Sequence, residues 1–531
     1  MTWILGVNVP PVGWHDTAAC LVDETGRVYA MAEEERFTRT KHGVHEQPLN
    51  AVSFVLESAG VAPADVDVVA VGWDVPRMYG VHAMRWGFGG PDALLRAIGL
   101  TGTGRRPDVV FVDHHRAHAV SGLYAAGVAE AAVLVVDGNG EDESASLFEA
   151  RRGRPMVRRR RWSRVRSLGI MYAAVSQALG FGILGAGKTM GLASYGRDGG
   201  VEPWQLLDDD LTPPFAHTDE DSYDQVLESW VEHIGGLLGR TSLTVDTDTL
   251  DKVPEAVRLA WSAQHTVERA IAAMVARARE ETGLEDVCLA GGVALNCSAN
   301  GMLPQPVHAP PIPHDAGVAL GAAWSLCDGR PGGPLDPYLG SPVLRAGEEL
   351  PVASEPLRVD RVVELLCRGA IGALAVGRAE VGPRALGHRS IIALPSAVEV
   401  RDEINLTKGR EHWRPLAPVA RVQDAGRFWS ERPTLQRYML GATQVTAEAR
   451  AVMPAAVHVD GSVRAQVVDE RAGLIHELLG ALSDAGVPPV LINTSLNTRG
   501  EPLVNTATEA LRAFDAIGLD FVVVGDRLVV R

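Results

Sequence analysis

Long apolar runs are missing from this sequence of 531 residues, and none reaches the roughly 18 to 20 residues that a membrane-spanning helix needs. The opening stretch MTWILGVNVPPVG lacks the basic start of a secretory signal and is interrupted by Pro and Gly. Cysteine is also scarce, because the five thiols are scattered without the CxxC spacing of zinc sites or redox pairs. We therefore expect no membrane partner and no disulfide framework, and we predict a cytoplasmic protein with reduced thiols.

Basic residues are in deficit, since 50 Lys and Arg face 66 Asp and Glu and leave a net charge of −16. An acidic chain is not expected to attract nucleic acid through its overall field. Residues 151–166 depart from this composition with nine arginines. Such a run is either a polyanion or nucleic-acid patch, or a hairpin that turns at RGRP with its Arg side chains in solvent. We favour the hairpin, because no aromatic residues interleave with the arginines to stack on bases.

The chain is longer than one hydrophobic core usually supports, so more than one domain is expected. Short apolar segments that end in polar clusters alternate with helical segments, which predicts an α/β fold with ligands at the C-terminal ends of the strands. Residues 336–356 are rich in Pro and Gly and carry no hydrophobic period. We therefore predict a first domain over residues 1–335, a linker over 336–356 and a second domain over 357–531.

Residues 182–189 match the phosphate-loop pattern GxxxxGK[ST], with Lys188 as the lysine. That pattern holds phosphate when a buried strand enters the loop and a helix leaves it. Here residues 167–181 have apolar residues at helical spacing, so a helix is expected to enter the loop. The glycines that follow Thr189 are expected to interrupt any helix that leaves it. We do not expect a P-loop hydrolase, and Lys188 remains a candidate phosphate or backbone contact in another architecture.

Two histidines and two aspartates suggest a metal site. His114 and His118 in DHHRAH are four residues apart, so on a helix their imidazoles leave the same face. Taken alone, the pair is better explained as ordinary helix-face histidines, and the HExxH pattern of zinc proteases is missing because His115 stands in place of Glu. Asp137 ends an apolar strand and Asp315 precedes a helix of small residues, and these two carboxylates favour the metal. Such a ligand set suits iron, manganese or zinc.

Glycine turns follow two of the predicted strands, in DGNGE and LAGGVALN. Glycine lets a backbone approach a phosphate or adenosine closely, although any strand also needs a turn. Two such turns in a chain that opens with a strand-hairpin pattern are similar to the actin, Hsp70 and sugar-kinase fold, which clamps a nucleotide between two related halves. The candidate nucleotide contacts in these turns are Gly138, Asn139, Gly140, Gly291, Gly292 and Asn296.

The predicted second domain concentrates basic residues in one window of loops. Their arginines alternate with Gly and Pro rather than with Glu at helical spacing, which is typical of bidentate contacts to phosphate oxygens. The later segment INTSLN offers amide and hydroxyl groups at a strand end. We expect an anion site that includes Arg384, Lys408, Arg414, Asn493 and Ser495. The full basic window consists of Arg378, Arg384, Arg389, Arg401, Lys408, Arg410 and Arg414.

Taken together, these motifs resemble the O-carbamoyltransferase family that includes nodulation carbamoyltransferases and the enzymes that carbamoylate antibiotics. The resemblance extends over nearly the whole chain, and as a set the motifs are highly specific. They are HDTAACLVD, AEEERFTRTKHG, DHHRAHA, VVDGNGE, GAGKTMGLASYG, LAGGVALNCSANG, HDAGVALGAAW, GRAEVGPRALGHRS, TKGREHWRPLAP and NTSLNTRGEP. The phosphate-loop match at 182–189 is then a coincidence inside a family motif.

The resemblance implies an actin-like first domain, similar to the tRNA threonylcarbamoyl-transfer ATPases, and a YrdC-like second domain. It implies that carbamoyl phosphate and ATP, with Mg²⁺, form carbamoyl adenylate in the second domain. A hydroxyl of a small-molecule acceptor then attacks the adenylate in the first domain, beside one divalent metal ion, with iron expected first and manganese or zinc as alternatives. In this scheme His15 is the general base, Asp16 orients it, and Lys41 and His42 contact substrate, while the glycine-turn residues and Lys188 contact the adenylate.

Two alternatives remain at this point. An ATP-dependent sugar or alcohol kinase of the actin-like fold would explain the glycine turns but would leave the histidine pair and the second basic domain without a role. A nucleic-acid-binding protein would use residues 151–166. The motifs do not specify the acceptor alcohol or the oligomeric state.

Overall fold

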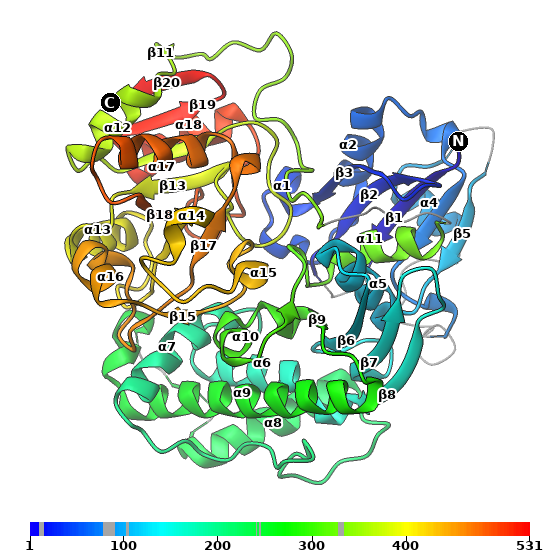
Figure 1. Cartoon of the computed structure of the whole chain (residues 1–531). Coiled ribbons are helices and arrows are strands. Elements are labelled where there is room, and N and C mark those ends of the chain that lie inside the picture. Colours follow the sequence, from blue (N-terminus) through cyan, green and yellow to red (C-terminus); the bar gives the residue numbers. More distant parts are fainter. Residues whose placement is uncertain (10–14, 78–90, 102–105, 241, 244–245, 328–333) are drawn as a thin grey trace.

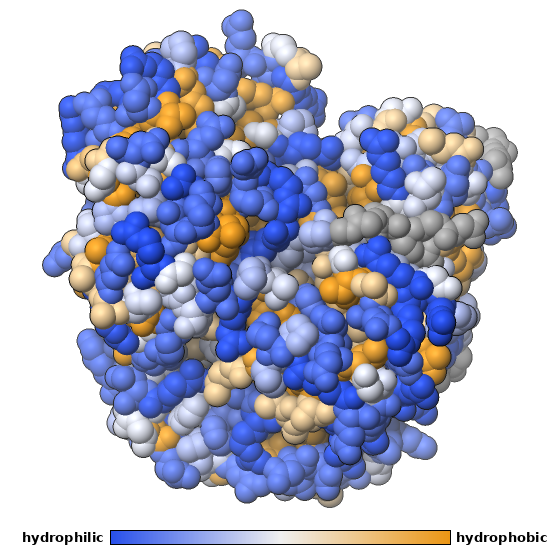
Figure 2. Space-filling model, in the orientation of Figure 1, coloured by the Kyte–Doolittle hydropathy of each residue, from blue (hydrophilic) through white to orange (hydrophobic). Residues whose placement is uncertain are grey.

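A computed structural model describes the chain except for residues 10–14, 78–90, 102–105, 241, 244–245 and 328–333 (Figure 1). The fold is α/β, as predicted, with two five-stranded mixed sheets and an eight-stranded sheet. Within the described residues no helix combines the length and the apolar character that crossing a bilayer requires. Figure 2 shows a mostly hydrophilic face on which hydrophobic residues form only small groups.

The first sheet has the strand order β3-β2-β1-β4-β5. Its central strand β1 pairs antiparallel with β2 and parallel with β4, while β3 is antiparallel to β2 and β5 is parallel to β4. These strands are short and apolar, and the predicted series of strands and tight turns at the N-terminus is confirmed. Their bounds are β1 Trp3–Asn8, β2 Ala18–Asp23, β3 Val28–Glu33, β4 Val68–Val71 and β5 Asp108–Phe111.

The second sheet repeats this topology, with the order β10-β9-β6-β7-β8. Here β6 takes the place of β1, because it pairs antiparallel with β7 and parallel with β9, while β8 and β10 extend the two sides. Two halves of the same topology confirm the actin-like arrangement that was expected of the first domain. The bounds are β6 Glu130–Val136, β7 Glu143–Arg151, β8 Val157–Ser163, β9 Val287–Ala290 and β10 Val307–His308.

Strands β7 and β8 form the predicted arginine-rich hairpin. Arg159 and Arg160 reach the carboxylates of Glu149 and Glu281, and both arginines lie at the surface. The hairpin prediction is therefore confirmed, and it accounts for most of the basic run without a nucleic acid.

Helices α5 (His114–Ala126) and α11 (Ala316–Ser325) pack between the two sheets. Small residues let them approach closely, since a Cβ on Gly321 would lie 1.8 Å from the carbonyl oxygen of Ala117. On the outer face of the second sheet lies a helical layer with its own apolar core, visible at the bottom of Figure 1. It contains α6 (Leu168–Ala178), α7 (Ala186–Asp198), α8 (Tyr223–Leu238) and α9 (Pro254–Thr282).

The phosphate-loop match begins in the connection between α6 and α7 and extends into the first turn of α7. A helix enters the loop, as predicted, so the strand that a P-loop requires is not the preceding element. The expectation that glycines would interrupt a helix after Thr189 was wrong, because α7 continues through Gly191 and Gly196. Packing explains this, since a Cβ on Gly196 would lie 2.5 Å from the Trp261 side chain, so these glycines allow α7 to lie close to α9.

The third sheet carries the order β11-β20-β19-β12-β13-β18-β14-β17. Helices α12 (Val359–Cys367) and α17 (Leu474–Asp484) cover one face, and α13 (Val398–Thr407) and α18 (Ala507–Ile517) pack on the other. The strands are β11 Glu355–Pro356, β12 Gly372–Ala375, β13 Arg389–Ala393, β14 Ala417–Arg421, β17 Gln466–Val468, β18 Val490–Ser495, β19 Phe521–Val524 and β20 Arg527–Val530.

The segment predicted as a linker, 336–356, packs on this sheet. Val343 is buried in its core, Tyr338 stacks on His388 with ring centroids 3.7 Å apart, and β11 pairs with β20. The segment thus has tertiary contacts of its own, while the division into domains at residues 335 and 357 stays a prediction.

The two parts of the chain meet through buried polar contacts. The Arg36 guanidinium donates to the Gly382 carbonyl over 2.7 Å, and the Gly382 N–H donates to Glu33 over 2.6 Å. The Trp413 indole also donates to the Thr247 carbonyl over 3.0 Å. The junction is therefore fixed at several separate points.

The close crossing of α5 and α11 predicts opposite effects for two glycine substitutions. Gly321→Ala should destabilise the protein by about 1–3 kcal/mol, because a methyl group would clash with the Ala117 carbonyl. Gly236→Ala in α8 should stabilise it by up to about 1 kcal/mol, since nothing lies within 4 Å and alanine favours helix. Thermal unfolding of both variants checks the signs, and a Gly321→Ala protein as stable as wild type would contradict the crossing.

Candidate active site

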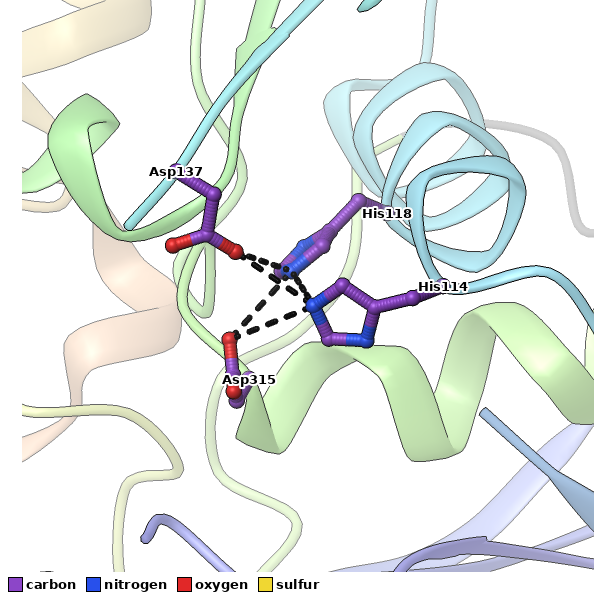
Figure 3. Close-up of side chains that lie close together, drawn as sticks. All are labelled: His114, His118, Asp137 and Asp315. Atoms are coloured by element: carbon purple, nitrogen blue, oxygen red, sulfur yellow. Dashed lines mark hydrogen bonds and ion pairs between the residues drawn. The ribbon is translucent and has the colours of Figure 1, made fainter. Parts of the chain in front are cut away.

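Four buried side chains converge on one point between the two sheets (Figure 3). The Nε2 atoms of His114 and His118 lie 3.1 Å apart, and the Asp137 Oδ2 atom lies 3.3 and 3.2 Å from them. The Asp315 Oδ1 atom lies 3.6 and 3.4 Å from the same nitrogens. All four ligand atoms lie within 4.8 Å of one another, so the predicted two-His, two-Asp set is brought together.

Three of these residues stand at the end of a regular element, and His118 lies about one turn into α5. The side chain of Asp113 caps α5 by accepting from the Arg116 N–H over 2.8 Å, and so begins the helix that carries both histidines. Asp137 follows the last residue of β6, and Asp315 precedes α11. The α/β arrangement thus gathers the four from three separate elements.

Neighbouring groups orient the ligands. The His114 Nδ1 donates to the Gly72 carbonyl over 3.1 Å, which leaves the Nε2 lone pair facing the centre, and Trp73 stacks on the imidazole with ring centroids 3.8 Å apart. The other oxygen of Asp137 accepts from the N–H groups of Gly138 and Gly292 over 2.7 and 3.2 Å. One oxygen of Asp137 is thereby held by backbone, and the other faces the histidines.

The electrostatics of the cluster favour a cation. Burial opposes protonation of His114, but Asp315 and Asp137 outweigh it and raise the His114 pKa well above its usual value. Burial also opposes ionisation of Asp137, but the two imidazoles lower its pKa well below the usual range. The carboxylates thus remain charged and require positive charge beside them. Two imidazole nitrogens and two carboxylate oxygens fit a divalent transition-metal ion.

His15 and His42 lie on either side of the Asp16 carboxylate. The His15 Nδ1 lies 2.8 Å from one oxygen and the His42 Nδ1 lies 3.1 Å from the other. Burial disfavours protonation of His15, but Asp16 outweighs it, with help from Asp315 and Asp137, and raises the His15 pKa to about 9. The influence of Asp315 and Asp137 shows that His15 lies within the field of the four-residue cluster.

The glycine turns hold the metal-site backbone, whereas their asparagines have structural partners. A Cβ on Gly291, at φ 87°, would lie 2.3 Å from the Val136 carbonyl oxygen. Asn139 accepts from Arg164, and Asn296 bonds to Gln264 over 2.9 Å and caps α10 (Cys297–Met302). The nucleotide contacts predicted for Asn139, Gly140 and Asn296 remain predictions.

Five cations gather near the C-terminal end of β18, where Lys408 and Arg410 bond to Ser495 and Thr494. Arg384 also donates to the Leu295 carbonyl of the first domain. Burial, reinforced by Arg410, Arg414 and Lys41, lowers the Lys408 pKa well below its usual value. Burial and the neighbouring Arg464 lower the Arg384 pKa to about 9. Guanidinium groups keep their protons at cellular pH, so this shift reflects burial of Arg384 beside another cation. The cation cluster consists of Arg384, Lys408, Arg410, Arg414 and Arg464.

The first domain contributes Lys41 and Lys188 to the surroundings of this cluster. Burial lowers the Lys41 pKa, and Arg414, Arg410 and Lys188 lower it further. Lys41 in turn contributes to the lowered pKa of Lys408. Lys188 donates to the Glu411 carboxylate over 2.8 Å, and Arg414 lies 3.6 Å from the other oxygen of Glu411. Lys188, the lysine of the phosphate-loop match, therefore crosses to the second domain.

The remaining predicted residues divide into two groups. Lys408 donates to the Asn497 side chain over 2.9 Å, and the same Asn497 oxygen accepts from the Ser495 hydroxyl over 2.7 Å. Asn493 lies on the same strand as Ser495, and its Oδ1 atom is buried and has no hydrogen-bond partner among the described residues. By contrast, three arginines of the basic window have structural contacts: Arg378 and Arg389 donate to backbone carbonyls, and Arg401 pairs with Asp402.

Sequence reasoning missed Arg464, Glu411 and Trp73. Arg464 lies in no motif with other basic residues, so only the fold brings it to the cluster. Glu411 lies in TKGREHWRP, a segment whose basic residues predict an anion site and give no indication of a contact made by a carboxylate. Trp73 directly precedes Asp74 at the end of an apolar strand. This position at a strand end is the sequence feature that could have identified Trp73 as a site residue.

Comparison with known proteins gives a consistent family. Residues 4–79 and 92–324 match the family described as Carbamoyltransferase N-terminus, and residues 363–531 match Carbamoyltransferase C-terminus. Nodulation protein NolNO of Sinorhizobium fredii is 32% identical over 562 residues, which cover 98% of this chain and 80% of that protein. The 3'-hydroxymethylcephem-O-carbamoyltransferase of Amycolatopsis lactamdurans is 35% identical over 249 residues, or 45% of this chain and 47% of that protein.

Among solved structures, this chain is similar to full-length HypF in its phosphate- and nucleotide-bound form. The match spans 61% of this chain and 55% of the HypF chain, at 14% identity and a TM-score of 0.32. The two family matches include all four residues of the His/Asp cluster and all five of the cation cluster. The kinase alternative is not favoured, because neither matched region is that of a kinase family. This chain belongs to the carbamoyltransferase family.

Proposed function

We propose that the protein is an ATP-dependent O-carbamoyltransferase that carbamoylates a hydroxyl of a small-molecule natural product, such as an antibiotic. The observation that carries the proposal is the presence, in one carbamoyltransferase chain, of a buried His/Asp cluster and a separate cation cluster. The first supplies a cation-binding centre, and the second supplies contacts for phosphate groups. Two such sites fit a reaction that activates a carbamoyl group and then transfers it.

Activation belongs to the cation cluster. Carbamoyl phosphate gives up its phosphate to water, and the carbamate oxygen then attacks the α-phosphorus of Mg²⁺-bound ATP, so that pyrophosphate leaves and carbamoyl adenylate forms. Arg384, Lys408 and Arg414 would neutralise the phosphate oxygens, with Asn493 and Ser495 at the strand end beside them. Carbamate becomes a useful electrophile only when its oxygen carries a good leaving group, which AMP provides.

Transfer belongs to the first domain. The acceptor hydroxyl loses its proton to His15 as its oxygen attacks the carbamoyl carbon, and AMP leaves. Asp16 holds the Nδ1 side of His15, so that the Nε2 atom is available as the base, and it also holds His42. Lys41 and His42 are proposed substrate contacts. A divalent ion on the His/Asp cluster, with iron the first candidate, would polarise the carbonyl oxygen on which charge develops.

The ligand assignment predicts that His118→Ala loses most of the bound metal, because a buried imidazole that faces the other three ligands is removed. Metal content is measured by elemental analysis of purified protein. His15→Asn is the matched control, since His15 contacts Asp16 rather than the cluster, and it should keep its metal. Equal metal in His118→Ala and wild type would refute the site.

The activation assignment predicts that Lys408→Ala abolishes pyrophosphate release from ATP and carbamoyl phosphate while the fold survives. Removal of one of five crowded cations relieves repulsion in the free protein but removes a phosphate contact. Arg401→Ala is the control, because Arg401 belongs to the same basic window but pairs with Asp402 at the surface. Normal pyrophosphate release by Lys408→Ala would contradict the assignment.

The base assignment predicts that His15→Asn slows carbamoyl transfer by about 10²–10⁴-fold and leaves pyrophosphate release nearly intact. Carbamoyl adenylate should then accumulate, which chromatography of the quenched reaction would detect. Loss of pyrophosphate release together with transfer, or unaffected transfer, would exclude this role.

The pH dependence of transfer gives a second test of the same residue. A base must be neutral, so with a His15 pKa raised to about 9 the transfer rate should rise with pH toward that value. The Asp16→Asn variant lacks the carboxylate that does most to raise the His15 pKa, while burial still disfavours protonation of His15. The His15 pKa should therefore fall, and the acid limb of the pH–rate profile should move to lower pH. An unmoved limb would show that another group titrates.

A further inference from the structure

Asn8, the last residue of β1, is fully buried and makes hydrogen bonds in two directions. Its Nδ2 atom donates to the Asp16 carbonyl over 2.8 Å and to the His15 carbonyl over 3.5 Å. Its Oδ1 atom accepts from the indole N–H of Trp73 over 2.9 Å. A carbonyl only accepts and an indole only donates, so these partners fix which way the amide faces. One buried side chain therefore connects the His15–Asp16 pair to Trp73.

Trp73 carries this connection to His114 of the His/Asp cluster (Figure 3). Its fully buried indole stacks on the His114 imidazole, with ring centroids 3.8 Å apart. The preceding residue, Gly72, accepts from the His114 Nδ1 atom over 3.1 Å. The Asp74 N–H donates to Glu141 over 2.8 Å, and the same Glu141 oxygen accepts from the His114 N–H over 3.0 Å. The segment that follows β4 is thus attached to the first residue of α5 in three ways.

The backbone of Asp16 needs support from its neighbours. Its φ of 60° lies in the left-handed region, which Asp adopts more readily than most residues but still at a cost in free energy. The Asp16 N–H donates to the His42 carbonyl over 2.6 Å, and the Asp16 carbonyl accepts from Asn8. Both backbone polar groups are therefore held, while the carboxylate contacts His15 on one side and His42 on the other. Loss of either support would let the carboxylate move.

We propose that Asn8 and Trp73 are positioning residues, which hold the His15–Asp16 pair at a fixed place relative to the His/Asp cluster. Both act through other residues. Transfer needs the base and the cluster at a set separation around one carbamoyl group, and a misplacement of about 1 Å slows such a step by roughly 100-fold. This role rests on the proposed function, since it requires His15 to be the base, whereas the hydrogen bonds that connect the two sites do not.

The pH dependence of carbamoyl transfer distinguishes positioning from a purely structural role. Asn8→Ala removes the donor to the Asp16 carbonyl, so the Asp16–His15 contact should weaken and the His15 pKa should fall. The acid limb of the pH–rate profile should then move to lower pH, in the same direction as in Asp16→Asn. Transfer should slow at least about tenfold, and pyrophosphate release and metal content should stay intact. The other charged groups that act on the His15–Asp16 pair, all of which the variant retains, are His42, His314, Asp137 and Asp315.

A second variant avoids the loss of a buried amide. Trp73→Phe keeps an aromatic ring on His114 and removes only the indole N–H that orients Asn8. It should retain its metal and move the acid limb in the same direction by a smaller amount. Trp324→Phe is the matched control, because Trp324 is an equally buried indole that donates to the Gly26 carbonyl over 2.8 Å, at the end of α11 opposite to Asp315. Its profile should match that of wild type.

NMR titration of full-length protein with ¹³C-labelled histidine reads the pair without an activity assay. The His15 signal is identified as the one that His15→Asn lacks. It should titrate at lower pH in Asn8→Ala and Trp73→Phe than in wild type and Trp324→Phe.

An unchanged His15 titration in both folded variants would overturn the positioning role, and so would an unmoved acid limb. If Asn8→Ala does not fold, Trp73→Phe decides the question alone. A shifted titration together with wild-type transfer by His15→Asn would instead overturn the base assignment of the proposed function and leave the connection between the two sites standing.

Discussion

Two carboxylates and two imidazoles that face one another in a buried space impose the main constraint on this structure. Charged carboxylates that lack water need positive charge or hydrogen-bond donors nearby, and each of the four side chains is held for that purpose. Asp137 takes its donors from two glycine N–H groups, and His114 is fixed by the Gly72 carbonyl and by Trp73. The glycine turns, the helix crossing and the repeated sheet topology together place these ends beside one another.

The cation cluster presents the opposite problem at the domain junction. Arginines and lysines that lie close together repel one another, and burial removes the water that would screen them. Glu411 is a carboxylate within their reach, and it is shared between Lys188 of the first domain and Arg414 of the second. The two domains are therefore joined beside the cluster that we propose as the phosphate site, so a ligand bound there would affect the contact between the domains.

Much of this arrangement was predictable from the sequence because it follows local rules. The strands, the arginine hairpin and the helix before the phosphate-loop match have clear periodicity and turn residues. The i, i+4 spacing of His114 and His118 predicted a shared face, and the strand-end position of Asp137 predicted its place at the edge of the sheet. Motif resemblance then supplied the family, which the comparisons confirm.

What could not be predicted depends on contacts between distant segments. Nothing in the local sequence separates Arg384, which joins the cation cluster, from Arg389, which donates to backbone carbonyls in the interior. Helix α7 was missed because its glycines are unfavourable locally, and only the closeness of α9 compensates for them. The partners of Asn139 and Asn296 likewise come from elements far along the chain.

The crossing of α5 and α11 has a consequence for how the proposed metal ion would be acquired. His114 and His118 belong to one helix and Asp315 precedes the other, and backbone contact at Gly321 fixes the separation of the two helices. The ligands are thus placed by packing of the protein rather than by an ion that gathers them. Such a site would exist once the chain has folded, so loading of the proposed ion would be a separate, later event, and the ions that the cell makes available would compete for it.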